Sequence, residues 1–187
     1  MGRSKIAVFR ELLDDEHRAQ DANSAFEDAY GRRIEAGETA ALPTAEAALY
    51  ELRDGGVQVA VTTGFSAPTR DALLVSLGWE ELVDLALSPT PKLRGRPAPD
   101  LVLGALLELG IEDVRFVAVA GDTTNDLYAG HRAGAGIVAG ILGGAHPREE
   151  LERAPHTHIF ETIGEFAGLV CADRPAAVEA SGRVAGT

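Results

Sequence analysis

The sequence predicts an α/β protein built on a parallel sheet, and two patterns carry this prediction. From residue 57 onward, short apolar stretches alternate with longer amphipathic ones, as in repeated strand–helix–strand units. Small polar and charged side chains follow several of the apolar stretches, where a strand would end and a helix begin. Because parallel strands bring their carboxyl ends to one edge of the sheet, we expect these side chains to gather there.

The N-terminal part, residues 3–35, predicts two helices that are more polar than the rest of the chain. Ile6, Phe9 and Leu12 recur at helical spacing in the first helix, and the second has a sparse apolar stripe. The Ala-, Gly- and Arg-rich end of the chain has little to bury, which predicts disorder. We therefore expect three regions, which are a helical appendage (1–40), an α/β core (41–172) and a disordered tail (173–187).

Within the core region, helices and strands are expected in turn. Thr44 is placed to cap the first helix, which Gly55 and Gly56 end. Pro97 and Pro99 suit the approach to a later helix and its first turn. The expected helices cover residues 44–54, 68–77, 100–109, 125–133, 147–152 and 163–170. The expected strands cover residues 57–62, 85–87, 116–120, 137–142 and 158–160.

Composition narrows the class of protein. The 187 residues are 45% hydrophobic and 25% charged, as is usual for a globular chain with one core. The net charge of −12 argues against nucleic acid or an anionic membrane as a main partner. A single cysteine, Cys171, fits a reducing compartment and is expected to be a packing residue. No apolar run approaches the roughly 18 residues of a membrane span, so we expect a cytoplasmic protein.

The stretch V-A-V-A-G-D-T-T-N-D, residues 117–126, is the most informative in the chain. Its apolar part predicts a buried strand, with Asp122 at the carboxyl end and Asp126 in the first turn of the next helix. Two carboxylates close enough to share a site suit Mg²⁺, which prefers oxygen ligands. The alternative is an aspartate that caps the helix, followed by a solvated aspartate.

Two further stretches predict anion binding. The strand over residues 57–62 ends in T-T-G-F, where the Thr63 hydroxyl and the N–H groups beside Gly64 suit a phosphate oxygen. Phe65 would then line the same pocket. In P-K-L-R-G-R-P-A-P, residues 91–99, the rigid loop favours an inward-pointing Arg96, whose guanidinium suits a phosphoryl group. The alternatives are an ordinary turn and a solvated basic loop.

The order of these features resembles the haloacid dehalogenase superfamily of phosphohydrolases, over about residues 1–170. The resemblance implies a Rossmann-like core with a helical cap and a bound Mg²⁺. It implies that Thr63 binds the transferring phosphoryl group and that Arg96 neutralises that group and the nucleophile. Asp122 would hold Mg²⁺, and Asp126 would support the metal site. Phosphoryl transfer needs positioning and charge neutralisation, which these parts supply.

The arginine within G-R-P-A-P and the opening M-G-R-S-K resemble the phosphonatase (phosphonoacetaldehyde hydrolase) branch. That branch carries a Met-Gly-x-x-Lys segment in its cap, which places Gly2 at the substrate. Its lysine, matched by Lys5, forms a Schiff base with the aldehyde. Arg3 and Arg10 are expected to lower the pKa of Lys5 and so favour the nucleophilic amine. The alternative is a solvated helix lysine.

Two departures favour a different small phosphorylated or phosphonate metabolite over phosphonoacetaldehyde itself. The branch has a histidine three residues after the lysine, where this chain has Val8. It has an apolar residue before the lysine, where this chain has Ser4.

The superfamily's nucleophile motif, Asp-x-(Asp or Ala)-Gly-Thr, does not occur in this sequence. The family places that motif on the first, central strand of its sheet. We expect that truncation or a misassigned start removed the segment with this strand from the sequence. Without that strand, two inner sheet edges lose their partner, which predicts low stability and association, with a homodimer as the candidate assembly. We also expect the chain to be inactive. The alternative is a non-catalytic fragment that binds phosphate or a partner.

Overall fold

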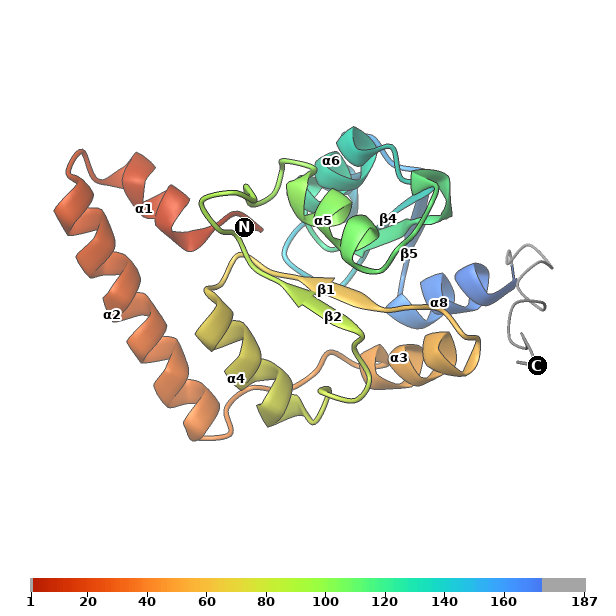
Figure 1. Cartoon of the computed structure of the whole chain (residues 1–187), viewed down its shortest axis with the longest axis horizontal. Helices are drawn as coiled ribbons and strands as arrows, with labels where there is room; N and C mark the ends of the chain where they lie inside the picture. Colours follow the sequence, from red (N-terminus) through yellow and green to blue (C-terminus); the bar gives the residue numbers. More distant parts are fainter. Residues whose placement is uncertain (1, 173–187) are drawn as a thin grey trace, which may run out of the picture.

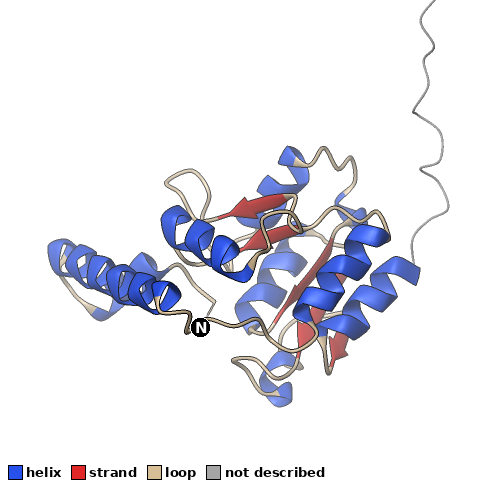
Figure 2. Ribbon diagram, turned by 90° about the horizontal axis from the view of Figure 1, so that it is seen from below, coloured by secondary structure: helices blue, strands red, loops and turns tan. Residues whose placement is uncertain are grey.

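A computed structural model describes residues 2–172, and the tail predicted over 173–187 lies outside them. Figures 1 and 2 show an α/β arrangement in which helices flank short parallel strands, as the sequence predicted. The helices are α1 (Lys5–Leu12), α2 (Glu16–Glu35), α3 (Ala45–Asp54), α4 (Ala67–Leu77), α5 (Asp100–Glu108), α6 (Thr124–Ala133), α7 (Arg148–Leu151) and α8 (Ile163–Ala172). The strands are β1 (Ala60–Thr62), β2 (Leu85–Leu87), β3 (Ala118–Gly121), β4 (Ile137–Ile141) and β5 (His158–Phe160).

The five strands form two separate parallel sheets. β1 pairs with β2, and β4 lies between β3 and β5. Within residues 2–172, no ladder joins β1 to β3, so each of these strands keeps an open edge. The two strands therefore do not pair with each other, in agreement with the expectation that two sheet edges lack a partner.

Two strands, β1 and β3, begin later than predicted. Hydrogen bonds within turns and to side chains occupy the backbone N–H groups of the residues expected to start each strand. Val57 N–H donates to the Leu52 carbonyl and closes the end of α3 (2.9 Å), while Val59 N–H donates to the Asp84 carboxylate (2.7 Å). Before β3, residues 114–116 form a 3₁₀ turn in which the Asp113 carboxylate accepts the Arg115 N–H (2.8 Å). Apolar composition alone does not reveal such competition for backbone donors.

Helices α1 and α2 form a hairpin at one side of the molecule, and α2 packs against α4 (Figure 1). The Asp15 carboxylate caps α2 by accepting the Arg18 N–H (2.8 Å). Phe9 of α1 meets Phe26 of α2 with ring centroids 6.2 Å apart. The hairpin is thus held by few apolar contacts, in agreement with its polar sequence.

The main core lies where α3 and α8 pack together beside the sheets. Leu49, Leu52 and Val59 are buried there, with Trp79 and Cys171 packed at the edge of the cluster. The prediction that Cys171 is a packing residue is confirmed. Thr44 precedes α3 as predicted, but its backbone is left-handed (φ 67°) and its side chain makes no capping bond.

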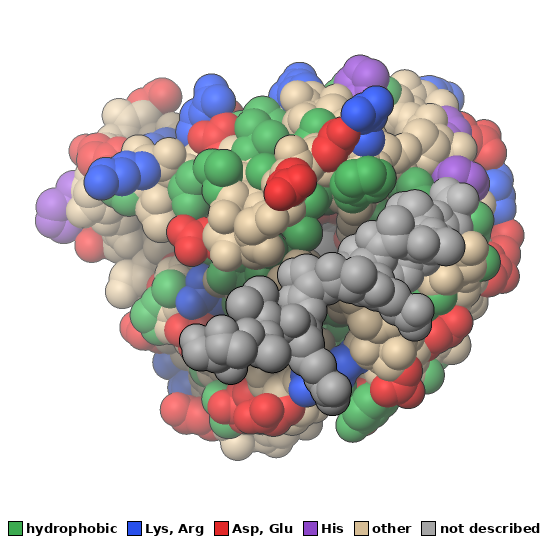
Figure 3. Space-filling model, turned by 45° about the vertical axis from the view of Figure 1, so that its right-hand side comes forward, with side chains coloured by type: hydrophobic (Ala, Val, Ile, Leu, Met, Phe, Trp, Pro, Cys, Tyr) green, Lys and Arg blue, Asp and Glu red, His purple; other side chains and the backbone are tan. Residues whose placement is uncertain are grey.

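Acidic, basic and apolar side chains are interspersed on the face shown in Figure 3. Among the described helices, none has both the length and the apolar character needed to cross a bilayer.

Candidate active site

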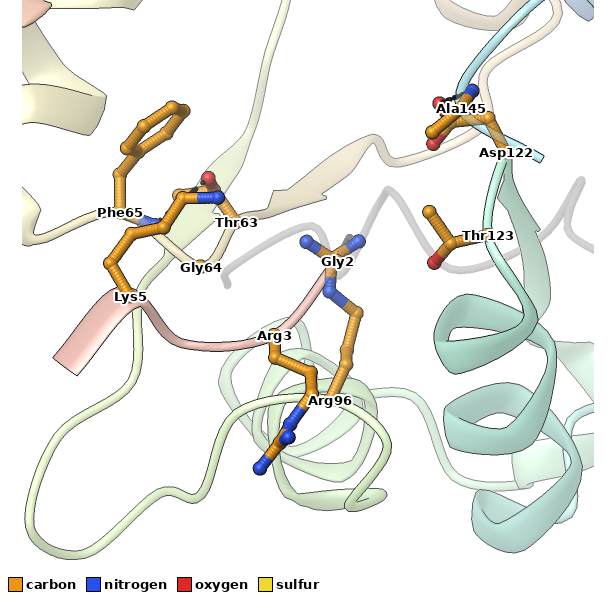
Figure 4. A pocket seen from close by; sticks show the side chains of 10 residues that line it. All are labelled: Gly2, Arg3, Lys5, Thr63, Gly64, Phe65, Arg96, Asp122, Thr123 and Ala145. Atoms are coloured by element: carbon orange, nitrogen blue, oxygen red, sulfur yellow. Dashed lines mark hydrogen bonds between the residues drawn. The ribbon is translucent and has the colours of Figure 1, made fainter. Parts of the chain in front are cut away.

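A cavity of about 190 Å³ opens where β1 and β3 end, beside the start of α1 (Figure 4). Thr63, Arg96 and Asp122, which are far apart in the sequence, all line it. The other lining residues are Gly2, Arg3, Lys5, Gly64, Phe65, Thr123 and Ala145. The edge of the molecule at which the polar residues gather is the one that parallel-strand topology predicts.

The loop after β1 is held at both ends. Thr63 N–H donates to the Leu87 carbonyl of β2 (3.1 Å), and the Thr63 hydroxyl accepts the Phe65 N–H (3.2 Å). Gly64 touches the segment that leads into α1, since a Cβ here would lie 2.3 Å from the Arg3 carbonyl oxygen. Lys5 N–H donates to the Gly64 carbonyl (3.2 Å). The loop therefore positions Thr63 and the start of α1 together.

Arg96 is paired with Asp126 behind the cavity. The Arg96 side chain is 17% exposed and the Asp126 side chain 3%, and the two form an ion pair. The other Asp126 oxygen accepts the Thr123 N–H (3.0 Å) and the Thr123 hydroxyl (2.6 Å), which completes a capping box at the start of α6. A Cβ at Gly121 would lie 2.3 Å from Asp126 Cβ, so the glycine of the G-D motif makes room for this carboxylate.

This geometry separates the two carboxylates of the G-D-T-T-N-D stretch. Both Asp126 oxygens accept from protein donors, and Asp126 does not line the cavity. Asp126 is in contact with the cavity-lining Arg96 and balances its charge. Asp122, in contrast, lines the cavity itself.

Asp122 follows β3 directly and accepts the Ala145 N–H at its Oδ2 (2.8 Å). Among the described residues, it is the one carboxylate that lines the cavity, and no cluster of three or more His, Cys, Asp or Glu side chains is placed to bind a metal. Mg²⁺ commonly takes one or two protein carboxylates and completes its shell with water and phosphate oxygens. Asp122 fits the part of one such ligand.

Lys5 begins α1 and reaches toward the cavity. Its Nζ lies 5.6 Å from the Phe26 ring centroid and 5.3 Å from that of Phe65. Burial lowers the pKa of Lys5, and the positive charge of Arg96 lowers it further.

The expectation that Arg3 and Arg10 tune Lys5 is therefore wrong. Each is tied to a carboxylate instead, Arg3 to Glu11 and Arg10 to Glu16. Although Arg3 lines the cavity, its charge is balanced by Glu11, and Arg96 is the cation that lowers the pKa of Lys5.

The other basic residues of the 91–99 loop and three histidines differ in where they lie relative to the cavity. Lys92 and Arg94 are exposed, and Arg94 pairs with Asp100 (2.8 Å), so Arg96 is the basic residue of its loop that reaches the cavity. His146 lies near the site, where its Nδ1 accepts the Thr124 N–H (3.3 Å). His156 and His158 are on the surface.

Arg3, Thr123 and Ala145 line the cavity but were not predicted as site residues. Thr123 adjoins Asp122 in the G-D-T-T motif, so its place in the cavity could have been predicted from the sequence. The sequence pointed to Arg3 only as a neighbour of Lys5 and gave no sign of Ala145, since their places in the cavity depend on how distant loops fold.

The fold and the cavity define an α/β protein whose polar cavity lies at the carboxyl ends of its parallel strands. The chain belongs to the haloacid dehalogenase-like hydrolase family, whose model matches residues 2–134. The resemblance read from the sequence motifs is thereby confirmed.

Known proteins that resemble this chain agree with the assignment. "Probable phosphatase IndB" of Dickeya dadantii is 32% identical over 117 residues, which are 63% of this chain and 50% of that protein. Phosphonoacetaldehyde hydrolase of Pseudomonas aeruginosa is 29% identical over 192 residues, covering 88% of this chain and 67% of that protein. The crystal structure of a hydrolase from Pseudomonas syringae superposes with a TM-score of 0.81 at 23% identity, covering 94% of this chain and 81% of that one. The chain thus spans about half to two thirds of the length of these two curated relatives.

Proposed function

We propose that this chain carries the phosphoryl-binding and carbonyl-binding parts of a Mg²⁺-dependent hydrolase of a small phosphorylated or phosphonate metabolite. One observation supports this most directly, namely that Thr63, Arg96, Asp122 and Lys5 line a single cavity of about 190 Å³. A cavity of this size limits the substrate to a small molecule. The names of the related phosphatase and phosphonoacetaldehyde hydrolase point the same way.

Each side chain has a role that its surroundings support. The Thr63 hydroxyl donates to a phosphoryl oxygen, and the Arg96 guanidinium balances the negative charge. Arg96 Nε is buried without a hydrogen-bond partner among the described residues, so the guanidinium is not fully satisfied by protein groups. Asp122 holds Mg²⁺, which would neutralise phosphoryl charge when bound.

Lys5 serves the carbonyl end of the substrate. Its lowered pKa increases the share of neutral amine, the form that attacks a carbonyl carbon. The amine then forms an imine, which gives the electrons of a breaking C–P bond a place to go.

The phosphoryl acceptor is not among the residues that line the cavity. Asp122 is the one carboxylate there within residues 2–172, and it is assigned to the metal. We therefore propose that this chain alone binds the phosphoryl group without turning it over. The second candidate function, a non-catalytic phosphate-binding module, rests on the same observation.

Calorimetric titration with inorganic phosphate, with and without Mg²⁺, tests the proposal. We expect phosphate binding that Mg²⁺ strengthens, and Asp122→Asn should remove the Mg²⁺ effect while metal-free binding remains. Glu38→Gln, which alters an exposed carboxylate paired with Arg33, is the matched control and should bind as the parent chain does. Absence of phosphate binding under both conditions would overturn the assignment.

Assays with p-nitrophenyl phosphate test whether this chain carries the phosphoryl acceptor. No turnover is expected from this chain. Turnover that depends on Asp122 would show that the acceptor lies within it after all.

A further inference from the structure

Two aromatic rings from separate parts of the chain meet at Lys5. Phe26 lies on α2 and Phe65 in the loop after β1, and their ring centroids are 6.1 Å apart with an interplanar angle of 13°. Lys5 Nζ lies within 6 Å of both centroids, at 5.6 and 5.3 Å. Tyr30, one turn further along α2, packs against Phe65 with centroids 4.6 Å apart. The phosphoryl-binding role of the site does not require these rings.

A polar contact between the next residues joins the same two segments. Ser66 Oγ donates to Glu27 Oε2 (2.7 Å), and Asn23 Nδ2 donates to Glu27 Oε1 (3.2 Å). Glu27 follows Phe26 and Ser66 follows Phe65, so the hydrogen bond and the ring pair form one contact. Both Glu27 and Ser66 are partly buried, which shields the bond from water.

The chemistry proposed for Lys5 would benefit from such surroundings. The neutral Nζ attacks a carbonyl carbon, a C–N bond forms, and the carbonyl oxygen takes up protons and leaves as water. The product is a protonated imine, which carries one positive charge at the former Nζ. Apolar walls favour the neutral amine before the attack, while ring faces attract the cation that forms afterwards.

We propose that Phe26 and Phe65, held together by Glu27 and Ser66, form an aromatic clamp that positions Lys5 and stabilises its protonated imine with a small aldehyde. Phe26 and Glu27 are then positioning residues on α2, which act only when α2 rests on the loop that carries Thr63. This inference rests on the proposed role of Lys5. It also gives α2 a part in the selection of carbonyl substrates. Imine formation at Lys5 is efficient only when Phe26 of α2 lies against Phe65.

The chain offers an internal control, because Lys5 and Lys92 are its only lysines and Lys92 is exposed. The full chain is incubated with acetaldehyde and sodium cyanoborohydride, and ethylation of each lysine is followed by peptide mass spectrometry. We expect Lys5 to be alkylated faster than Lys92. Phe26→Leu should slow Lys5 by about 3- to 10-fold, as loss of a cation–π partner predicts. Lys92 should not change.

Further variants distinguish the effect of an aromatic ring on Lys5 from the effect of apolar packing alone. Phe26→Tyr keeps an aromatic face and should retain the parent rate at Lys5. Glu27→Ala should slow Lys5 in the way that Phe26→Leu does. Ser76→Ala removes a hydroxyl contact with Thr39 at the far end of α4 (3.2 Å) and should leave Lys5 unchanged.

The outcomes distinguish the clamp from the proposed function. If Lys5 of the parent chain reacts no faster than Lys92, the carbonyl role of Lys5 fails. If Lys5 is preferred but Phe26→Leu and Glu27→Ala react as the parent chain does, the clamp fails while the function stands. Equal slowing by Phe26→Leu and Phe26→Tyr would also overturn the clamp. Should Phe26→Leu not fold, Phe26→Tyr and Glu27→Ala still decide the question.

Discussion

Asp126 shows how the role of a residue depends on its partner. It is almost completely buried, caps α6 through Thr123 and balances Arg96, whose guanidinium lines the cavity. A buried carboxylate is tolerated because each of its oxygens has a donor. The same pairing keeps Arg96 from moving away from the cavity, so one carboxylate serves both the helix and the anion site.

Replacing Asp126 should therefore cost stability as well as binding. Asp126→Asn leaves the Arg96 charge poorly balanced in a buried place, and the loss is expected to be about 3–5 kcal/mol. Urea unfolding measures it. Glu38→Gln, which breaks the exposed pair with Arg33, should cost no more than about 1 kcal/mol. Similar losses in both variants would contradict the role given to Asp126.

Lys5 gives a prediction about pH. Burial and Arg96 lower its pKa, so the folded chain binds fewer protons than the unfolded chain at pH values between the two pKa values. The Lys5 contribution to the free energy of unfolding should therefore rise with pH from the lowered pKa up to the ordinary lysine value of about 10.4. Urea unfolding across this range, compared with Lys5→Met, measures the difference. A parent chain and variant with parallel pH profiles would show that Lys5 is not perturbed.

At the scale of elements, α1 is positioned by the loop between β1 and α4. The Lys5 N–H to Gly64 carbonyl bond and the close approach of Arg3 to Gly64 fix the start of the helix. The Glu27–Ser66 hydrogen bond fixes α2 against the end of the same loop. The hairpin therefore reaches the site through backbone and polar contacts as well as through the rings of Phe26 and Tyr30 against Phe65.

Replacing each of two glycines by alanine tests the contact between the start of α1 and the loop after β1. Gly64→Ala introduces a Cβ that would lie 2.3 Å from a backbone oxygen, so something must shift, at a cost of about 1–3 kcal/mol. Gly31→Ala on α2 meets nothing within 4 Å and should stabilise the helix by about 0.5–1 kcal/mol. Urea unfolding compares the two, and Lys5 alkylation should change only in Gly64→Ala. Equal effects of the two substitutions on stability and on Lys5 alkylation would contradict a tight contact at Gly64.

At the scale of the whole molecule, the most unusual feature is the open edge on each of the two small sheets. Within residues 2–172, β1 pairs only with β2 and β3 only with β4, so each has one edge without a strand partner. Unpaired backbone groups on a strand edge favour pairing with another chain. The net charge of −12 opposes such association by repulsion between copies.

The balance of these two effects predicts an assembly that depends on salt. Added NaCl screens the repulsion, since the Debye length falls to about 3 Å at 1 M. Light scattering after size exclusion should therefore show a larger mean mass at high salt and high protein concentration. A monomer that persists under all conditions and unfolds in one sharp transition would contradict the predicted low stability and association.

The sequence by itself determined the order and type of the elements and the gathering of Thr63, Arg96 and Asp122, because hydrophobic periodicity and parallel topology act locally and by general rules. Only the tertiary structure decided that Asp126 faces Arg96 and that Arg3 and Arg10 are neutralised by Glu11 and Glu16. It also decided that Phe26 and Phe65 meet at Lys5. These contacts join residues that are 6 to 60 positions apart, and the direction of a side chain over such separations depends on how helices and loops pack.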